Sequence, residues 1–145
     1  MLGGGGVDGA IHRAAGPGLL EACERVPAVN GIRCPAGEAR ITEAGNLNAR
    51  FVIHAVGPRY GIGPGPERLL AGAYRSSLDL ALENGCSSVA LPAISCGVYG
   101  YPLDDAAGIA VGTCSGESYR SLALTFYLFG DDVMSAWSRA LSRAD

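Results

Sequence analysis

The chain has 145 residues, of which 48% are hydrophobic and 17% charged, so it can build one domain with a substantial core and is too short for two ordinary ones. Its formal net charge is −3 and its eleven Lys and Arg positions form no run, which excludes a general basic surface for nucleic acid. No segment is apolar over the length of a bilayer, and no secretory signal pattern opens the chain, so a cytoplasmic protein without membrane contact is expected.

The cysteines are five in number and irregularly spaced, without the close Cys or His pairs that a structural zinc site needs. They are Cys23, Cys34, Cys86, Cys96 and Cys114. We therefore expect reduced thiols, no bound metal and no cofactor.

The first third of the chain contains two short helical patterns, over residues 8–15 and 19–25. Residues 40–43 form a short candidate strand near a sheet edge. Residues 51–56 (Phe-Val-Ile-His-Ala-Val) are apolar almost throughout and end at Gly57-Pro58, as expected for a strand covered on both faces.

The clearest helix begins at Pro66 and ends at Asn84-Gly85, so that both of its ends are marked. The residues that this helix places on one face are Leu70, Tyr74, Ser77, Leu78, Ala81 and Leu82.

The second half of the chain repeats the alternation of strand and helix. Residues 89–94 and 122–129 resemble the earlier buried strand, and amphipathic helices follow Pro102 and Asp131-Asp132. Strands that alternate with helices predict a single α/β domain over residues 1–145, with a mostly parallel or mixed central sheet covered by helices.

Four consecutive glycines, within the segment Gly3–Gly9, run directly into the first predicted helix. Glycines allow close approach to a ligand, and the free amides of a helix start favour an anion. The alternative is a flexible tail at the chain start.

A second glycine loop, Ser95–Pro102, joins a predicted buried strand to the helix opened by Pro102. Its two glycines, its run of backbone amides and its aromatic rings suit a pyrophosphate with an attached sugar. The alternative is an ordinary strand-to-helix turn. Neither loop contains Gly-Lys-Ser or Gly-Lys-Thr, so nucleoside triphosphate hydrolysis is disfavoured.

Four motifs occur in one order along the chain: GGGGVDGAIHRAAG, PAGEARITEAGNL, FVIHAVGP and SCGVYGYP. In this order they resemble the macrodomain family, in particular its MacroD-type branch. The resemblance implies a three-layer α/β/α fold and binding of ADP-ribose. It further implies hydrolysis of ADP-ribose esters, either on acidic side chains of proteins or in O-acetyl-ADP-ribose.

In this family the first loop lines the distal ribose and a phosphate. The residues at these positions are Gly4, Gly5, Gly6 and Val7. The resemblance makes Asp8 the carboxylate that positions and activates water; read from the residues alone, Asp8 is also a helix N-cap. His12 lies one turn further and would face the site, or be structural like His54.

The resemblance also assigns the second loop, whose backbone amides would hold the pyrophosphate and whose Tyr99 would lie against the distal ribose. Its residues are Ser95, Cys96, Gly97, Val98, Tyr99 and Gly100. Phe129 matches an aromatic position that packs on adenine, although a place in the core is an equal alternative.

The departure from the family lies at the chain start, because the family's Gly-Asp-Ile and Asn-Ala-Ala-Asn motifs, and the strands that carry them, are absent. One of those strands would lie between residues 51–56 and 89–94. Either the natural protein begins earlier, or these neighbours close up into a smaller sheet, or a partner chain supplies a strand, which leads us to expect self-association through a sheet edge. A non-catalytic ADP-ribose-binding module and a remnant without ligand binding are the alternatives to a hydrolase.

Overall fold

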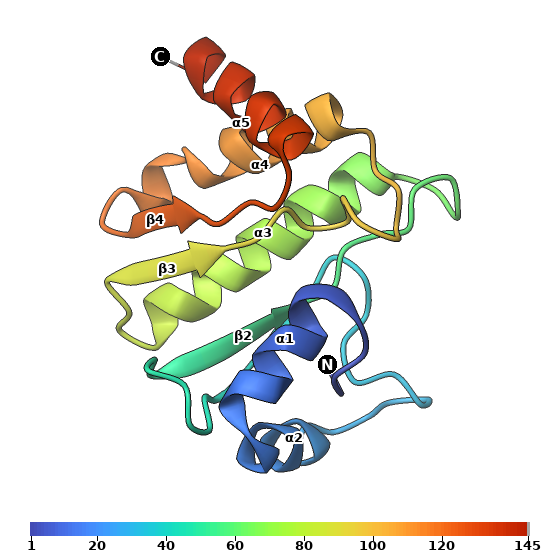
Figure 1. Cartoon of the computed structure of the whole chain (residues 1–145), viewed down its shortest axis with the longest axis vertical. Coiled ribbons are helices and arrows are strands. Elements are labelled where there is room, and N and C mark those ends of the chain that lie inside the picture. Colours follow the sequence, from blue (N-terminus) through green and yellow to red (C-terminus); the bar gives the residue numbers. More distant parts are fainter. Residues whose placement is uncertain (145) are drawn as a thin grey trace.

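The computed structural model describes residues 1–144 and confirms the alternation of helices and strands (Figure 1). The helices are α1 (Gly6–Ala15), α2 (Pro17–Glu24), α3 (Pro66–Glu83), α4 (Leu103–Cys114) and α5 (Asp131–Ala144), with a short 3₁₀ turn at Glu117–Tyr119. The strands are β1 (Ala39–Glu43), β2 (Phe51–Ala55), β3 (Ser88–Leu91) and β4 (Ala123–Phe126). Strand β3 ends earlier than predicted because Pro92 follows it, and proline has no backbone N–H to donate to the neighbouring strand.

Helix α3 is the element that the sequence predicts best. Its start carries Pro66 in the first turn, and Asn84 caps its end with Gly85 beyond in a left-handed conformation. The predicted apolar face is buried, including Tyr74 and Leu78, which are fully enclosed. This helix supplies the surface against which both pairs of strands pack.

The strands form two separate pairs. Strands β1 and β2 are antiparallel, with Ala39 opposite Ala55, and β3 and β4 are parallel, with Ser88 opposite Ala123. Among residues 1–144, β2 forms no ladder with β3, so the predicted central sheet is interrupted between them. The alternative that these neighbours close up into a smaller sheet is wrong, because within residues 1–144 β2 pairs with β1 and β3 pairs with β4, and not with each other.

The half of the molecule around β1 and β2 has three layers. Along β2, Val52 and His54 face a small core with α1 and α2, whereas Ile53 faces the larger core with α3. This alternation is the period of two that a strand imposes on its side chains. The prediction of a strand covered on both faces is therefore confirmed for β2.

The half around β3 and β4 is covered on one face only. Leu91 and Phe126 pack into the core shared by α3, α4 and α5. The residues that point the other way are exposed, and they are Ser88, Ala90, Ala123 and Thr125. The prediction of coverage on both faces is wrong for these two strands, because α1 and α2 pack against β1 and β2 instead.

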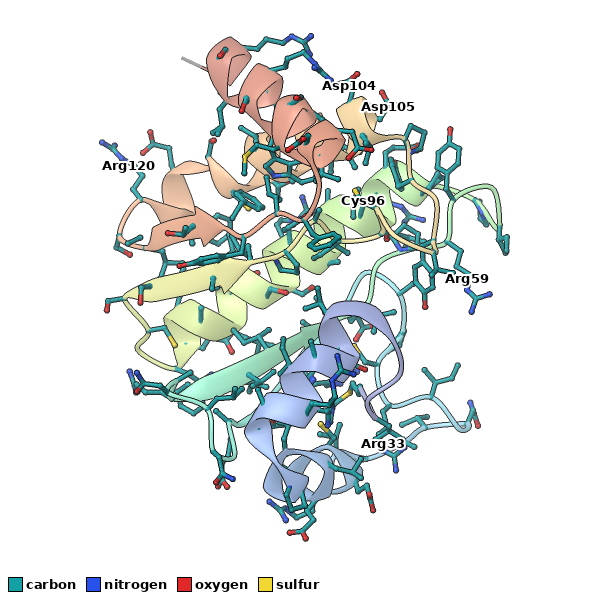
Figure 2. The ribbon with its side chains drawn as sticks, in the orientation of Figure 1. Arg33, Arg59, Cys96, Asp104, Asp105 and Arg120 are labelled. Atoms are coloured by element: carbon teal, nitrogen blue, oxygen red, sulfur yellow. The ribbon has the colours of Figure 1, made fainter. Side chains whose placement is uncertain are left out.

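Helices α4 and α5 are also joined at the surface. Asp104, at the start of α4, lies beside α5 (Figure 2) and accepts a hydrogen bond from Arg139 at 2.8 Å. Both side chains are about half exposed, so this pair contributes little, on the order of 0 to 1 kcal/mol. Among residues 1–144, no helix is long and apolar enough to cross a membrane.

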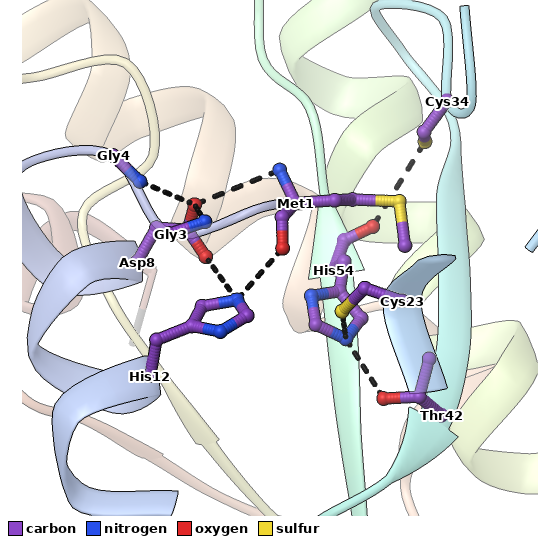
Figure 3. A network of polar contacts seen from close by, with 9 residues as sticks. All are labelled: Met1, Gly3, Gly4, Asp8, His12, Cys23, Cys34, Thr42 and His54. Atoms are coloured by element: carbon purple, nitrogen blue, oxygen red, sulfur yellow. Dashed lines mark hydrogen bonds and ion pairs between the residues drawn. The ribbon is translucent and has the colours of Figure 1, made fainter. Parts of the chain in front are cut away.

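His54 is a buried residue of β2 whose side chain faces α2. Its Nε2 lies 2.9 Å from Thr42 Oγ1 and 3.6 Å from the Cys23 sulfur (Figure 3). Burial, followed by the nearby Met1 ammonium, lowers the pKa of His54 from 6.5 to about 4. The imidazole is therefore neutral in the folded protein at physiological pH, as suits a structural histidine.

This histidine makes stability depend on pH. Because its folded pKa is below its unfolded value, the unfolded chain takes up the proton first as the pH falls. The effect of His54 on the free energy of unfolding is fully favourable above pH 6.5. As the pH falls towards about 4, the free energy of unfolding decreases by on the order of 3 kcal/mol because of this group. Urea unfolding at pH 7.5 and 4.5 should show this loss in the wild type and in His12→Gln, and a much smaller loss in His54→Gln. Equal pH dependence in His54→Gln and the wild type would contradict the assignment.

Candidate functional site

The carboxyl ends of β2, β3 and β4 lie at one edge of the molecule, where α1 also begins (Figure 1). The segment after β2, the second glycine loop after β3 and the residues after β4 all emerge there. In open α/β folds this edge is where ligands bind, because successive loops converge on it. The topology therefore brings both glycine loops to the same side of the molecule.

The first glycine loop leads into α1, whose N-cap residue is Gly5 and carries no side-chain cap. The amides of the first turn, from Gly6 to Asp8, thus have no partner within the helix. Asp8 is the third residue of α1, so its interpretation as the N-cap is wrong. Its carboxylate instead folds back on the loop, since Oδ2 accepts hydrogen bonds from the amides of Gly3 at 3.1 Å and Gly4 at 3.4 Å.

The Asp8 carboxylate has two further neighbours, shown in Figure 3. The Met1 ammonium lies 3.6 Å from Oδ2, and His12 Nε2 lies 3.4 Å from Oδ1. Partial burial acts to raise the pKa of Asp8, but the Met1 charge and the two amides outweigh it and lower the pKa below 3.8. At neutral pH the group is an ionised acceptor with 39% of its side chain still exposed.

His12 lies behind Asp8 on the same face of α1. Its Nε2 is 2.7 Å from the Met1 carbonyl oxygen, and only 11% of the side chain is exposed. Since both neighbours of this nitrogen are acceptors, Nε2 carries the proton. The structure therefore places His12 as a support for Asp8 and the chain start, with little surface to offer a ligand.

The second glycine loop presents unpaired amides. Among the described residues, the N–H groups of Gly97, Val98 and Tyr99 donate no hydrogen bond, whereas Gly100 donates to the Gly97 carbonyl at 3.0 Å. Gly97 and Val98 are exposed, with the Val98 side chain fully in solvent. Three successive free amides in a turn form a concave donor surface suited to an anion.

The side chains of Ser95 and Cys96 contact backbone carbonyl groups of the protein itself. Ser95 Oγ donates to the Pro58 carbonyl at 2.7 Å, and Cys96 Sγ contacts the Ile94 carbonyl at 3.5 Å. Burial raises the pKa of the Cys96 thiol to about 11, so it is protonated at neutral pH and is no nucleophile. Both side chains thus already have a partner within the protein.

Phe129 lies three residues beyond the end of β4 and is 97% exposed. The alternative of a core position is therefore wrong, and Phe126 and Leu128 take the core positions instead. Nearby Tyr127 is also exposed, at 68%. Two exposed aromatic side chains thus follow β4, at the edge formed by the carboxyl ends of the strands.

Sequence reasoning missed the segment after β2. Tyr60 donates its amide to the Tyr99 carbonyl at 2.9 Å, and the Arg59 guanidinium lies 5.1 Å from the centre of the Tyr99 ring. The only signal was the Gly57-Pro58 pair, which marks a turn directly after a buried strand. The segment therefore lies against the second glycine loop, at the same edge of the molecule.

Known proteins with similar sequences are macrodomain proteins. The Macro domain family model matches residues 1–110. A macro domain-containing protein of Vibrio parahaemolyticus is 62% identical over 143 residues, which cover 99% of this chain and 84% of that protein. A protein of Enterobacter cloacae named O-acetyl-ADP-ribose deacetylase is 50% identical over 151 aligned residues, covering 99% of this chain and 81% of its own length.

The structure agrees with these relatives. A macrodomain of Oceanobacillus iheyensis, solved with ADP, superposes with a TM-score of 0.91 at 43% identity, covering 99% of this chain and 78% of the other. The match extends over both glycine loops and the strands between them. By sequence and by structure, this chain belongs to the macro domain family.

Proposed function

We propose that the protein binds ADP-ribose at the edge formed by its two glycine loops. The observation that carries the proposal is the row of free amides from Gly97 to Tyr99, at the same edge as the uncapped start of α1. Both groups donate hydrogen bonds to an anion without any lysine, which the chain lacks altogether. The solved relative that holds ADP supports a diphosphate ligand.

The parts of the ligand follow from this placement. The pyrophosphate would lie on the amides of the second loop, the distal ribose between Gly4–Val7 and the Tyr99 ring, and the adenine against Phe129. Exposed aromatic rings provide stacking surface for a base and for the apolar face of a sugar. Among the described residues the amides of Gly97 to Tyr99 donate no hydrogen bond, so none has to be broken before they bind the pyrophosphate.

The activity we propose is hydrolysis of an ADP-ribose ester, with Asp8 as the general base. A water held by the ionised Asp8 would attack the ester carbonyl carbon, the bond to the ribose oxygen would break, and that oxygen would receive the proton. The products are ADP-ribose and a carboxylic acid. The relative named O-acetyl-ADP-ribose deacetylase supports this choice, and an ADP-ribosylated acidic side chain is the same ester chemistry.

A non-catalytic ADP-ribose-binding module is the second candidate. The specific observation in its favour is that Asp8 Oδ2 already accepts hydrogen bonds from the amides of Gly3 and Gly4. A carboxylate with these partners has fewer free lone pairs with which to accept a hydrogen bond from water. The binding proposal is unaffected, because the second loop makes no use of Asp8.

Titration calorimetry with ADP-ribose tests the binding, and we expect a dissociation constant in the micromolar range. Ligand at about a hundredfold over that constant should stabilise the fold by about 2.7 kcal/mol, visible as a higher melting temperature. Adenosine, which lacks the diphosphate, is the matched control and should bind far more weakly. Absence of both heat and thermal shift would show that this chain binds no ADP-ribose.

We also propose that the protein self-associates through its open strand edges. Within the described residues, β2 and β3 each pair on one side only, which leaves donors and acceptors free for another strand. Light scattering of the eluting peak would show a dimer, and a monomer at all concentrations would contradict it.

A further inference from the structure

The segment after β2 is tied to the second glycine loop at several points. Ser95 Oγ donates to the Pro58 carbonyl at 2.7 Å, and the Tyr60 amide donates to the Tyr99 carbonyl at 2.9 Å. The rings of Tyr60 and Tyr101 meet edge to face at 4.9 Å. These contacts lie near both ends of the second glycine loop, so the conformation of the loop depends on the neighbouring segment.

The backbone of Gly57 lies directly against side chains at the start of the second loop. Gly57 has no space for a side chain, because a Cβ there would collide with Ser95 Oγ and would lie 2.5 Å from Ile94 Cγ2. Ser95 itself has a left-handed backbone, with φ at 66°, a conformation that is costly for a residue with a side chain. Its hydrogen bond to Pro58 holds it there, so the loop geometry depends on the segment after β2.

Tyr99 is held at two places. Its carbonyl accepts from Tyr60, which fixes the backbone, and its ring carries the Arg59 guanidinium at 5.1 Å from the centroid. Arg59 is exposed at the edge of the site (Figure 2), and among residues 1–144 its side chain forms no ion pair and no hydrogen bond. The stacking on Tyr99 is therefore its one specific interaction.

We propose that Arg59 is a positioning residue that holds the Tyr99 ring in the orientation that receives the distal ribose. The assignment rests on the proposed ADP-ribose function. A guanidinium over one face of the ring restricts its rotation and leaves the other face for the sugar. The amide of Tyr99 does not depend on Arg59, because Tyr60 fixes the backbone, so pyrophosphate binding is independent of this contact.

The test compares ADP-ribose with ADP, which has the diphosphate but no distal ribose, by calorimetry on the whole chain. Arg59→Met keeps the aliphatic length and removes the charge, and it should weaken ADP-ribose by about threefold while ADP changes by less than about 1.5-fold. Arg59→Lys, which keeps a cation over the ring, should restore part of the loss. Both variants should have the melting temperature of the wild type, because the Arg59 side chain is exposed.

Equal losses for ADP and ADP-ribose would overturn the assignment, because they would show direct attraction of Arg59 for the phosphates. Unchanged affinity for ADP-ribose in Arg59→Met would overturn it as well, while leaving the proposed function intact. A wild-type chain that binds neither ligand would overturn the proposed function and, with it, the role of Arg59.

Discussion

Replacement of Asp8 with asparagine is expected to slow hydrolysis of O-acetyl-ADP-ribose by about a hundredfold or more. Asparagine keeps an oxygen that accepts from the amides of Gly3 and Gly4, so the loop should hold its shape. It lacks the negative charge that would draw a proton from water. Turnover is measured by chromatographic separation of product at saturating substrate, and ADP-ribose affinity, expected within about threefold of the wild type, by calorimetry.

Asp105→Asn is the matched control for this variant. Asp105 is the third residue of α4, as Asp8 is the third residue of α1, and it is exposed. The two substitutions therefore remove the same charge from the same position of a helix start. If Asp8→Asn keeps the wild-type rate, the carboxylate has no part in catalysis. If affinity and rate fall together by the same factor, Asp8 stabilises the conformation of the first glycine loop and has no separate role in catalysis.

Replacement of Gly9 with alanine is expected to weaken ADP-ribose binding by about tenfold to a hundredfold. Gly9 is buried in α1, and a Cβ there would collide with the Gly4 carbonyl oxygen and come within 3.2 Å of Arg13 Nη1. The first loop would have to move away from α1, which displaces the residues proposed to line the distal ribose. Calorimetry measures the loss, and circular dichroism confirms that the helices persist.

Gly108→Ala supplies the contrast, because Gly108 is also a glycine inside a helix but has open space around its Cα. This variant should be stabilised by about 0.5 to 1 kcal/mol, from the entropy that glycine loses in a helix, with binding unchanged. Wild-type affinity in Gly9→Ala would show that the first loop does not contribute to the ligand.

The local elements and their order can be predicted from the amino-acid sequence. Helix α3 is readable because its apolar residues recur at the helical period and its ends carry Pro66 and Asn84-Gly85, all of which act within a few residues. Strand β2 is readable because residues 51–56 are apolar except for His54 and are followed directly by Gly57-Pro58, a local pattern typical of a short buried strand. The two glycine loops stand out for the same local reason, since few other turns need so many residues of this kind.

Which of these elements contact one another depends on how the whole chain packs. The interruption between β2 and β3, the bare face of Ser88 and Ala90, and the exposure of Phe129 all depend on which helices cover which strands. The stacking of Arg59 on Tyr99 joins residues 40 positions apart in the chain, by a contact that has no periodic pattern. Contacts of this kind arise from the packing of whole elements against one another, so no window of neighbouring residues encodes them.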